Sequence, residues 1–127
     1  MPLPDSTTDA DLVALVNEWV MLLEREDYAG ALAFIEHEPS WTPEMLRDVI
    51  KTYGEARKSQ RVTLLGVPSD VTQRKEVDRW EESPSGEIGE IWYDLNIDGV
   101  VSDLTATFQL VRVRGGVVVR LLDVHVM

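Results

Sequence analysis

The sequence contains no cysteine. It therefore has no disulfide framework, no thiol nucleophile and no thiolate metal site. Its longest uncharged stretch is eight residues, so we expect no segment to cross a bilayer. The first residues lack the basic and apolar stretches of a signal peptide, and we expect a cytoplasmic protein without a membrane partner.

Positive charge is scarce. The 127 residues include 12 Lys and Arg against 23 Asp and Glu, a formal charge of −11. An acidic envelope repels phosphate backbones, which argues against a nucleic-acid partner, and it speeds encounter with a basic protein partner. We interpret the basic residues between positions 57 and 79 as a solvated loop and strand face: Arg57, Lys58, Arg61, Arg74, Lys75 and Arg79.

The N-terminal half has helical periodicity. Residues 1–8 are rich in Pro, Ser and Thr and predict a flexible leader, whereas residues 9–127 predict a single domain. Apolar residues at 3.6-residue spacing predict a first helix over about 9–25, and a second helix begins after Asp27 and ends before Pro39. Thr42, followed by Pro43, is typical of a helix start, and Gly54 of a helix end.

The apolar period changes from 3.6 to 2 near position 60, which is typical of strands. We expect strands over residues 61–67, 71–80, 88–97, 104–113 and 117–126. Asp98-Gly99 and Gly115-Gly116 predict hairpin turns between the last three. Helices followed by strands joined by short turns predict an α+β domain with an antiparallel sheet.

This order of elements resembles the nuclear transport factor two-like superfamily, which has the cystatin-like fold. The likeness depends on the apolar stripe over 12–23, the Asp27-Tyr28 and Thr42-Pro43 helix starts, and the two hairpins within 91–126. It implies three N-terminal helices packed on a strongly curved antiparallel sheet of about five strands, forming one cone-shaped domain over residues 9–127. Residues 102–105 and 122–126 are also similar to a group of small, uncharacterised bacterial members.

The superfamily includes ketosteroid isomerase, scytalone dehydratase, polyketide cyclases and domains that only bind or dimerise. The isomerase pattern uses a tyrosine on the first helix, but residues 9–25 contain none and Trp19 lies in the apolar stripe. The dehydratase pattern needs inward histidines, and this chain has two histidines in all. No catalytic residue of the family carries over to this sequence.

Asp123 and His125 are the most suggestive candidates for catalysis. Two residues apart on a strand, they share a face with Cα atoms about 6.5 Å apart. A carboxylate beside an imidazole can orient it as a general base, provided that the pair lies in a pocket. On the rim or outer face the same pair is a surface ion pair. Asp94 and Asp103 are further acids that would act only if they lay inside a pocket.

Trp92 is the main candidate for partner contact. If Ile91 and Tyr93 pack on the helices, alternation places Trp92 on the other face of the sheet. An indole exposed among valines marks a partner or dimer face. The residues that we expect to share this face are Val111, Val113, Val119 and Leu121.

We expect no metal site and no cofactor. His37 lies between two glutamates without a second imidazole, and Gly115-Gly116 is not followed by a helix that could cradle a phosphate. The sequence thus favours a non-catalytic binding module, a homodimer through the face that carries Trp92, with a basic protein as another partner. The alternative is an isomerase, dehydratase or cyclase that uses Asp103, Asp123 and His125 on a small apolar ligand.

Overall fold

The computed structural model describes residues 3–54, 56–66 and 73–126. Three helices come first in the chain: α1 (Asp9–Glu24), α2 (Tyr28–Phe34) and α3 (Pro43–Lys51). The strands are β1 (Glu36–His37), β2 (Val62–Thr63), β3 (Lys75–Arg79), β4 (Glu87–Ile97), β5 (Val100–Val113) and β6 (Gly116–Val126). The predicted α+β class, with helices at the N-terminal end, is confirmed.

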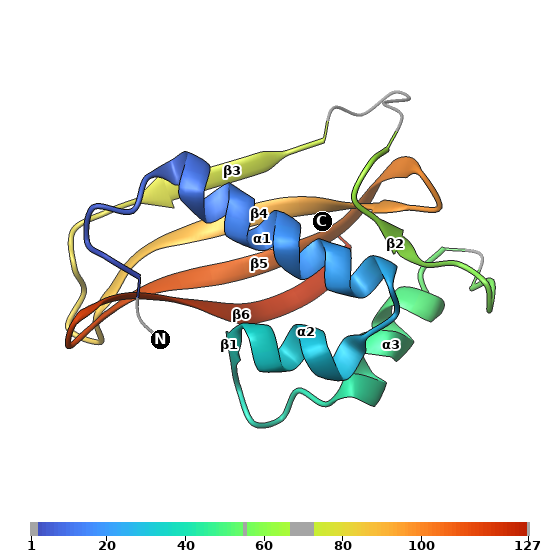
Figure 1. Ribbon diagram of the computed structural model, residues 1–127, viewed down its shortest axis with the longest axis horizontal. Coiled ribbons are helices and arrows are strands. Elements are labelled where there is room, and N and C mark those ends of the chain that lie inside the picture. The colour runs from blue at the N-terminus through green and yellow to red at the C-terminus, as the bar shows by residue number, and fades with distance from the viewer. Residues whose placement is uncertain (1–2, 55, 67–72, 127) are drawn as a thin grey trace.

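The strands form one strongly curved sheet in the order β1-β6-β5-β4-β2, and β3 also pairs with β4. Figure 1 shows α1 lying across one face of this sheet. All described pairs of strands are antiparallel except β1 and β6, so the sheet is mixed rather than purely antiparallel. The parallel pair was not predicted, because a strand of two residues has no detectable period.

β4 and β6 agree with the predicted strands to within one residue, whereas β5 begins at Val100, four residues before the strand expected over 104–113. The short strands differ more. Of the strand expected over 61–67 only β2 forms, and residue 67 lies outside the described residues. Of the strand expected over 71–80 only β3 forms, and residues 71–72 lie outside the described residues. Both hairpins are confirmed. Asp98 and Gly99 have φ angles of 51° and 80°, which suit a tight hairpin turn.

Polar side chains cap the predicted helix starts. Thr8 accepts a hydrogen bond from the Asp11 N–H, and the Asp11 carboxylate accepts one from the Thr8 N–H, which completes a capping box. Asp27 accepts from the Gly30 N–H, and Thr42 accepts from the Met45 N–H. Each cap satisfies an amide that the helix itself leaves without a partner.

The core lies between the helices and one face of the sheet. Trp19 of α1 meets Phe108 of β5 edge to face, with ring centroids 5.2 Å apart, and both side chains are fully buried. Around them pack Leu12 and Leu23 of α1 and Ile91 of β4. Helices and sheet therefore share one hydrophobic core. No helix among the described residues is long and apolar enough to cross a membrane.

Residues 3–8, the described part of the expected leader, and Asp9 contact the sheet at several points. Leu3 pairs with Val117 through two backbone hydrogen bonds of 2.7 and 2.8 Å. The Asp5 carboxylate is 2.7 Å from the Arg112 guanidinium. Arg79 contacts the Asp9 carboxylate at 2.7 Å. These contacts tie the N-terminal segment to β6, β5 and β3.

The Trp19–Phe108 contact predicts a large effect of truncation. We expect Phe108→Ala to lower the free energy of unfolding by about 3–5 kcal/mol, because it leaves a cavity under the indole. Chemical denaturation followed by circular dichroism measures this loss. Leu65→Ala is the control, since Leu65 is 81% exposed and should change stability by less than about 0.5 kcal/mol. Equal effects of the two substitutions would contradict the assigned core.

Tyr93 predicts an alkaline loss of stability. Its hydroxyl donates to Asn17 at 2.5 Å, and burial raises its pKa to about 12. The unfolded chain releases this proton near pH 10, so the stabilisation is complete below pH 10 and is lost as the pH rises to about 12. We expect a decline of about 2–3 kcal/mol over this range. Urea titrations should show a shallower decline for Tyr93→Phe; an equal decline would contradict the assignment.

Candidate functional site

The face of the sheet that points away from the core is the first candidate site. Strand pairing sets its side chains in rows: Glu90, Gln109 and Arg120 form one, and Trp92, Thr107 and Asp123 the next. None of these six residues belongs to the hydrophobic core. We call this surface the outer face; it comprises Glu76, Asp78, Glu87, Glu90, Trp92, Asp94, Thr105, Thr107, Gln109, Val111, Val118, Arg120, Asp123 and His125.

Trp92 lies on the outer face, as alternation predicted, but it is only half-exposed. The Arg74 guanidinium lies over its ring, 4.8 Å from the ring centroid. The same guanidinium is 3.5 Å from the Asp94 carboxylate, which also accepts from the Arg74 N–H at 3.0 Å and from the Thr105 hydroxyl at 2.8 Å. Asp94 is thus a buried acid whose contacts anchor the segment before β3 and hold Arg74 against Trp92.

The residues that we expected to share the partner-binding face with Trp92 are divided between the two faces of the sheet. Val111 lies on the outer face, paired with Val118, and Val113 is half-buried at the end of β5. The placement of Val119 and Leu121 on this face is wrong. They pair with Leu110 and Phe108, and all four side chains are in the core.

A β-bulge explains this error. The pairing between β5 and β6 shifts after Phe108–Leu121, so that Thr107 faces Asp123 and Leu122 is the extra residue. An extra residue reverses the alternation of a strand. Residues 119 and 121 therefore point into the core, whereas residues 123 and 125 point outward. A strand without this bulge would put all four on one face. The prediction put Val119 and Leu121 on the face of Trp92 and left the face of Asp123 and His125 open.

Asp123 and His125 do share a face, as predicted, with a carboxylate oxygen 3.1 Å from His125 Nδ1. Their side chains are 57% and 41% exposed. Asp103 is exposed in a second irregular stretch, where β5 carries three residues, 102–104, against one on β4. Its carboxylate accepts a hydrogen bond from the Tyr53 hydroxyl. Burial is the main reason that the pKa of Tyr53 is raised, and this hydrogen bond is the second reason. The structure does not join Asp103 to the Asp123–His125 pair through any described contact.

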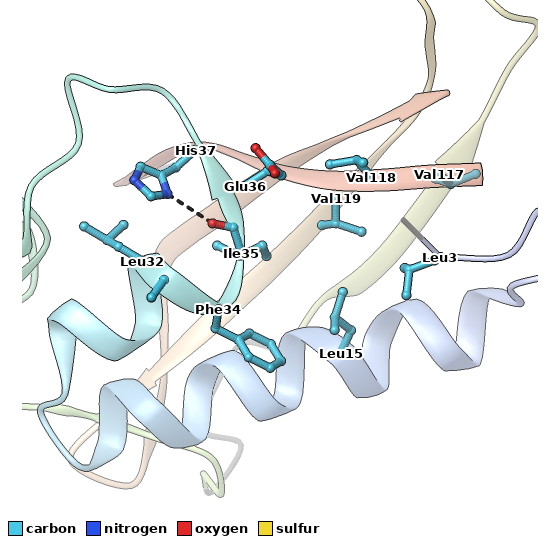
Figure 2. Close-up of a pocket in the computed structure, with 11 residues that line it drawn as sticks. Leu3, Leu15, Leu32, Phe34, Ile35, Glu36, His37, Val117, Val118 and Val119 are labelled. Carbon is cyan, nitrogen blue, oxygen red and sulfur yellow. Dashed lines mark hydrogen bonds between the residues drawn. The ribbon is translucent and has the colours of Figure 1, made fainter. Parts of the chain in front are cut away.

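Three surface hollows adjoin the described residues, and Asp103, Asp123 and His125 line none of them. The first, of about 430 Å³, lies between α1, the end of α2 and the start of β6. Figure 2 shows Phe34 on one side, Leu3 on the other, Leu15 below and Val119 above. The second hollow, of about 340 Å³, adjoins it across Leu3 and Leu15 and includes Asp11 and Glu18.

The third hollow lies at the turn of the β4–β5 hairpin, against the segment that follows α3. Its volume is about 430 Å³, and Tyr53, Gln60 and Ser102 contribute to its wall. The Gln60 amide donates to the Ile50 and Tyr53 carbonyls at 2.5 and 2.8 Å. These two bonds satisfy carbonyls at the end of α3, so Gln60 has a structural task here.

The described residues contain no cluster of His, Asp and Glu side chains suited to a metal ion. His37 is at the rim of the first hollow, and its Nδ1 is 3.0 Å from the Ile35 carbonyl. Since a carbonyl only accepts, Nδ1 donates this hydrogen bond. Glu36 precedes it on β1, where alternate residues point to opposite sides. The two side chains therefore do not converge on one ligand.

Sequence reasoning missed the first hollow and the row through Gln109. The hollow depends on the bridge of Leu3 to Val117 and on β1, neither of which has a sequence signal. Arg120 was overlooked because the bulge at Leu122 cannot be read from the apolar pattern. Comparisons with family models, curated proteins and solved structures find no match to this chain.

Proposed function

We propose that this protein is a non-catalytic binding module whose outer face associates with the same face of a second copy. One observation carries the proposal: the row formed by Glu90, Gln109 and Arg120 has opposite charges at its two ends, and β5 runs through its middle. Such a row is complementary to itself when it is reversed. An interface between identical copies requires this property.

A two-fold axis that runs along β5, between two facing sheets, reverses the row. It places β4 of each copy over β6 of the other. Glu90 then lies opposite Arg120 of the second copy, and the contact occurs twice. In the next row Trp92 lies opposite Asp123 of the second copy, where the indole N–H can donate to the carboxylate. An axis across the strands would instead set Arg120 against Arg120.

Among the described residues neither Glu90 nor Arg120 forms an ion pair, although Arg120 acts on the nearby Glu87: the hydrogen bond from the Ser83 hydroxyl, and to a smaller extent the charge of Arg120, lower the pKa of the Glu87 carboxyl. Within the described residues no carboxylate lies within 4 Å of the Arg120 guanidinium, and no cation lies that close to Glu90. Both side chains are half-buried, which limits their freedom and the entropy lost on pairing. At the rim the same arrangement brings Asp78 near Glu36 of the second copy, a repulsion that salt screens.

The size of the surface fits a dimer. Three strands about 4.8 Å apart and about eleven residues long, at about 3.3 Å per residue, cover roughly 500 Å² in flat projection. The relief of the side chains increases this area towards the roughly 800 Å² that each partner of a standard interface buries. Half-exposed Trp92 is the large side chain near the middle of the surface, where contacts contribute most.

The enzyme alternative receives less support. Asp123 and His125 form a solvated surface pair, and neither they nor Asp103 line any of the three hollows. A general base needs a bound substrate within hydrogen-bond reach.

We also propose that the chain is a member of the nuclear transport factor two-like superfamily. The order of its helices and strands supports this proposal.

The first test of the proposed dimer concerns Trp92. Sedimentation of the wild-type protein should give a species near twice 14.4 kDa, and Trp92→Asp should give a monomer, because it removes the central apolar contact. Met21→Asp is the control, since Met21 is 39% exposed and lies on α1, on the other side of the sheet. A wild-type monomer at high concentration, or a dimer in Trp92→Asp, would overturn the proposal.

The second prediction concerns charge exchange. Glu90→Arg sets two cations against each other, and Arg120→Glu sets two anions, so each variant alone should be monomeric at low ionic strength. Mixed in equal amounts, the two variants should form a heterodimer, because each new charge meets its opposite. The double variant Glu90→Arg/Arg120→Glu should dimerise again. Sedimentation of the four samples measures this pattern.

The outcomes of this second experiment are distinct. If the single variants remain dimers while Trp92→Asp is a monomer, association through the outer face stands and the axis along β5 is wrong. If the single variants are monomers and neither the mixture nor the double variant dimerises, the proposed pairing of Glu90 with Arg120 is likewise wrong. Circular dichroism of each variant checks that it is folded.

A further inference from the structure

β3 lies at one margin of the sheet and pairs with a single strand, β4. At its two ends the Asp94 N–H donates to the Arg74 carbonyl at 2.8 Å, and the Trp80 N–H donates to the Ile88 carbonyl at 2.9 Å. The even-numbered residues from 74 to 80 therefore direct their main-chain groups towards β4. By alternation, the odd-numbered residues direct theirs away from it.

The edge of β3 that points away from β4 carries three N–H and three C=O groups, those of Lys75, Val77 and Arg79. No described residue forms a main-chain hydrogen bond with any of them. Figure 1 shows β3 along the margin of the sheet. Val77 is half-buried and the other four residues of β3 are exposed. An exposed strand edge of this kind is a template for another strand.

The side chains of β3 argue against a second copy as that strand. Antiparallel pairing centred on Val77 would set Lys75 opposite Arg79 of the second copy, and Glu76 opposite Asp78. A shift of two residues would set Glu76 or Asp78 opposite itself. Like charges directly opposite each other on neighbouring strands are destabilising. The edge is thus protected against its own copy and requires a strand of different charge.

The two cations of β3 already have partners on the side of the sheet that faces α1. The Lys75 ammonium is 5.1 Å from the centroid of the Tyr93 ring. The Arg79 guanidinium is 2.7 Å from the Asp9 carboxylate. An added strand therefore does not need acidic residues to balance them.

The two anions of β3 lie on the outer face and have no such partners. Glu76 and Asp78 are exposed, and neither forms an ion pair with a described residue. Asp78 also lies directly opposite Glu90 of β4, so two carboxylates are neighbours on one face. Positive charge on an added strand would offset this repulsion.

We propose that the edge of β3 binds an extended segment of a partner protein, which adds as an antiparallel strand and carries basic residues at alternate positions. Strand addition obtains affinity from main-chain hydrogen bonds and specificity from alternate side chains. The basic side chains would lie opposite Glu76 and Asp78. Between them an apolar side chain would lie opposite Val77, which packs against the core. Antiparallel pairing is the more stable arrangement per residue.

Fluorescein-labelled peptides test the charge requirement by fluorescence anisotropy with the full chain. The basic peptide Ser-Thr-Lys-Val-Lys-Thr-Ser has lysines spaced to meet Glu76 and Asp78. It should bind at least about tenfold more tightly than Ser-Thr-Glu-Val-Glu-Thr-Ser, a difference of about 1.4 kcal/mol. Equal binding of the two peptides would contradict the proposed partner.

Main-chain methylation tests the added strand itself. In the antiparallel register the central valine N–H donates to the Val77 carbonyl, so its N-methylation should weaken binding at least about tenfold. N-methylation of the two lysines is the matched control, because their N–H groups point away from β3 and binding should change less than about threefold. Equal effects of the two methylations, or a larger effect at the lysines, would overturn antiparallel strand addition.

Protein variants locate the site. Val77→Pro removes an N–H that points away from β4, a position where an edge strand tolerates proline, and it should abolish binding of the basic peptide. Glu76→Gln/Asp78→Asn should weaken this binding about threefold or more, within the range of two exposed ion pairs. Glu38→Gln/Glu44→Gln is the matched control, because it removes the same charge at exposed residues beside α3 and should bind as wild type.

The variants also separate a site from general attraction to an acidic protein. If the control pair weakens binding as much as Glu76→Gln/Asp78→Asn, the peptide responds only to net charge and the inference is wrong. If Val77→Pro, shown to be folded by circular dichroism, binds as wild type, the edge of β3 is not the site. Neither result bears on the outer-face dimer, because the edge groups point along the plane of the sheet, away from the surface that a second copy would cover.

Discussion

The pairing of β4, β5 and β6 is the constraint on which the rest of the structure depends. These three strands set every side chain between residues 87 and 126 on one face or the other. At Leu122 an extra residue reverses the phase of β6. Leu121 therefore completes the core beside Phe108, and Asp123 is directed to solvent. A shift of one residue would bury a carboxylate and expose a leucine, which costs several kcal/mol.

This register also forms the outer face, which is proposed to bind a second copy. The outer face presents a row whose charges suit its own reversed copy, because Glu90 and Arg120 are equally far from β5 on opposite sides.

Much of the fold could be predicted from local sequence. The change of period near residue 60, the caps at Thr8 and Thr42 and the turn at Asp98-Gly99 all correspond to observed features. Each depends on residues close together in the chain. β2 and β3 are shorter than expected, because pairing with β4, rather than apolar period, limits an edge strand. β1 forms because α2 ends against the edge of β6, which no local pattern reveals.

The sequence by itself determined the class of fold, the acidic charge and the face on which Trp92 lies, because periodicity and composition are local properties. Only the tertiary structure decided which face carries Val119 and Leu121, since a bulge depends on the partner strand. It likewise decided that Asp94 is buried under Arg74 and that Asp123 and His125 form a solvated pair. Burial depends on what packs above a residue, and those neighbours come from distant parts of the chain.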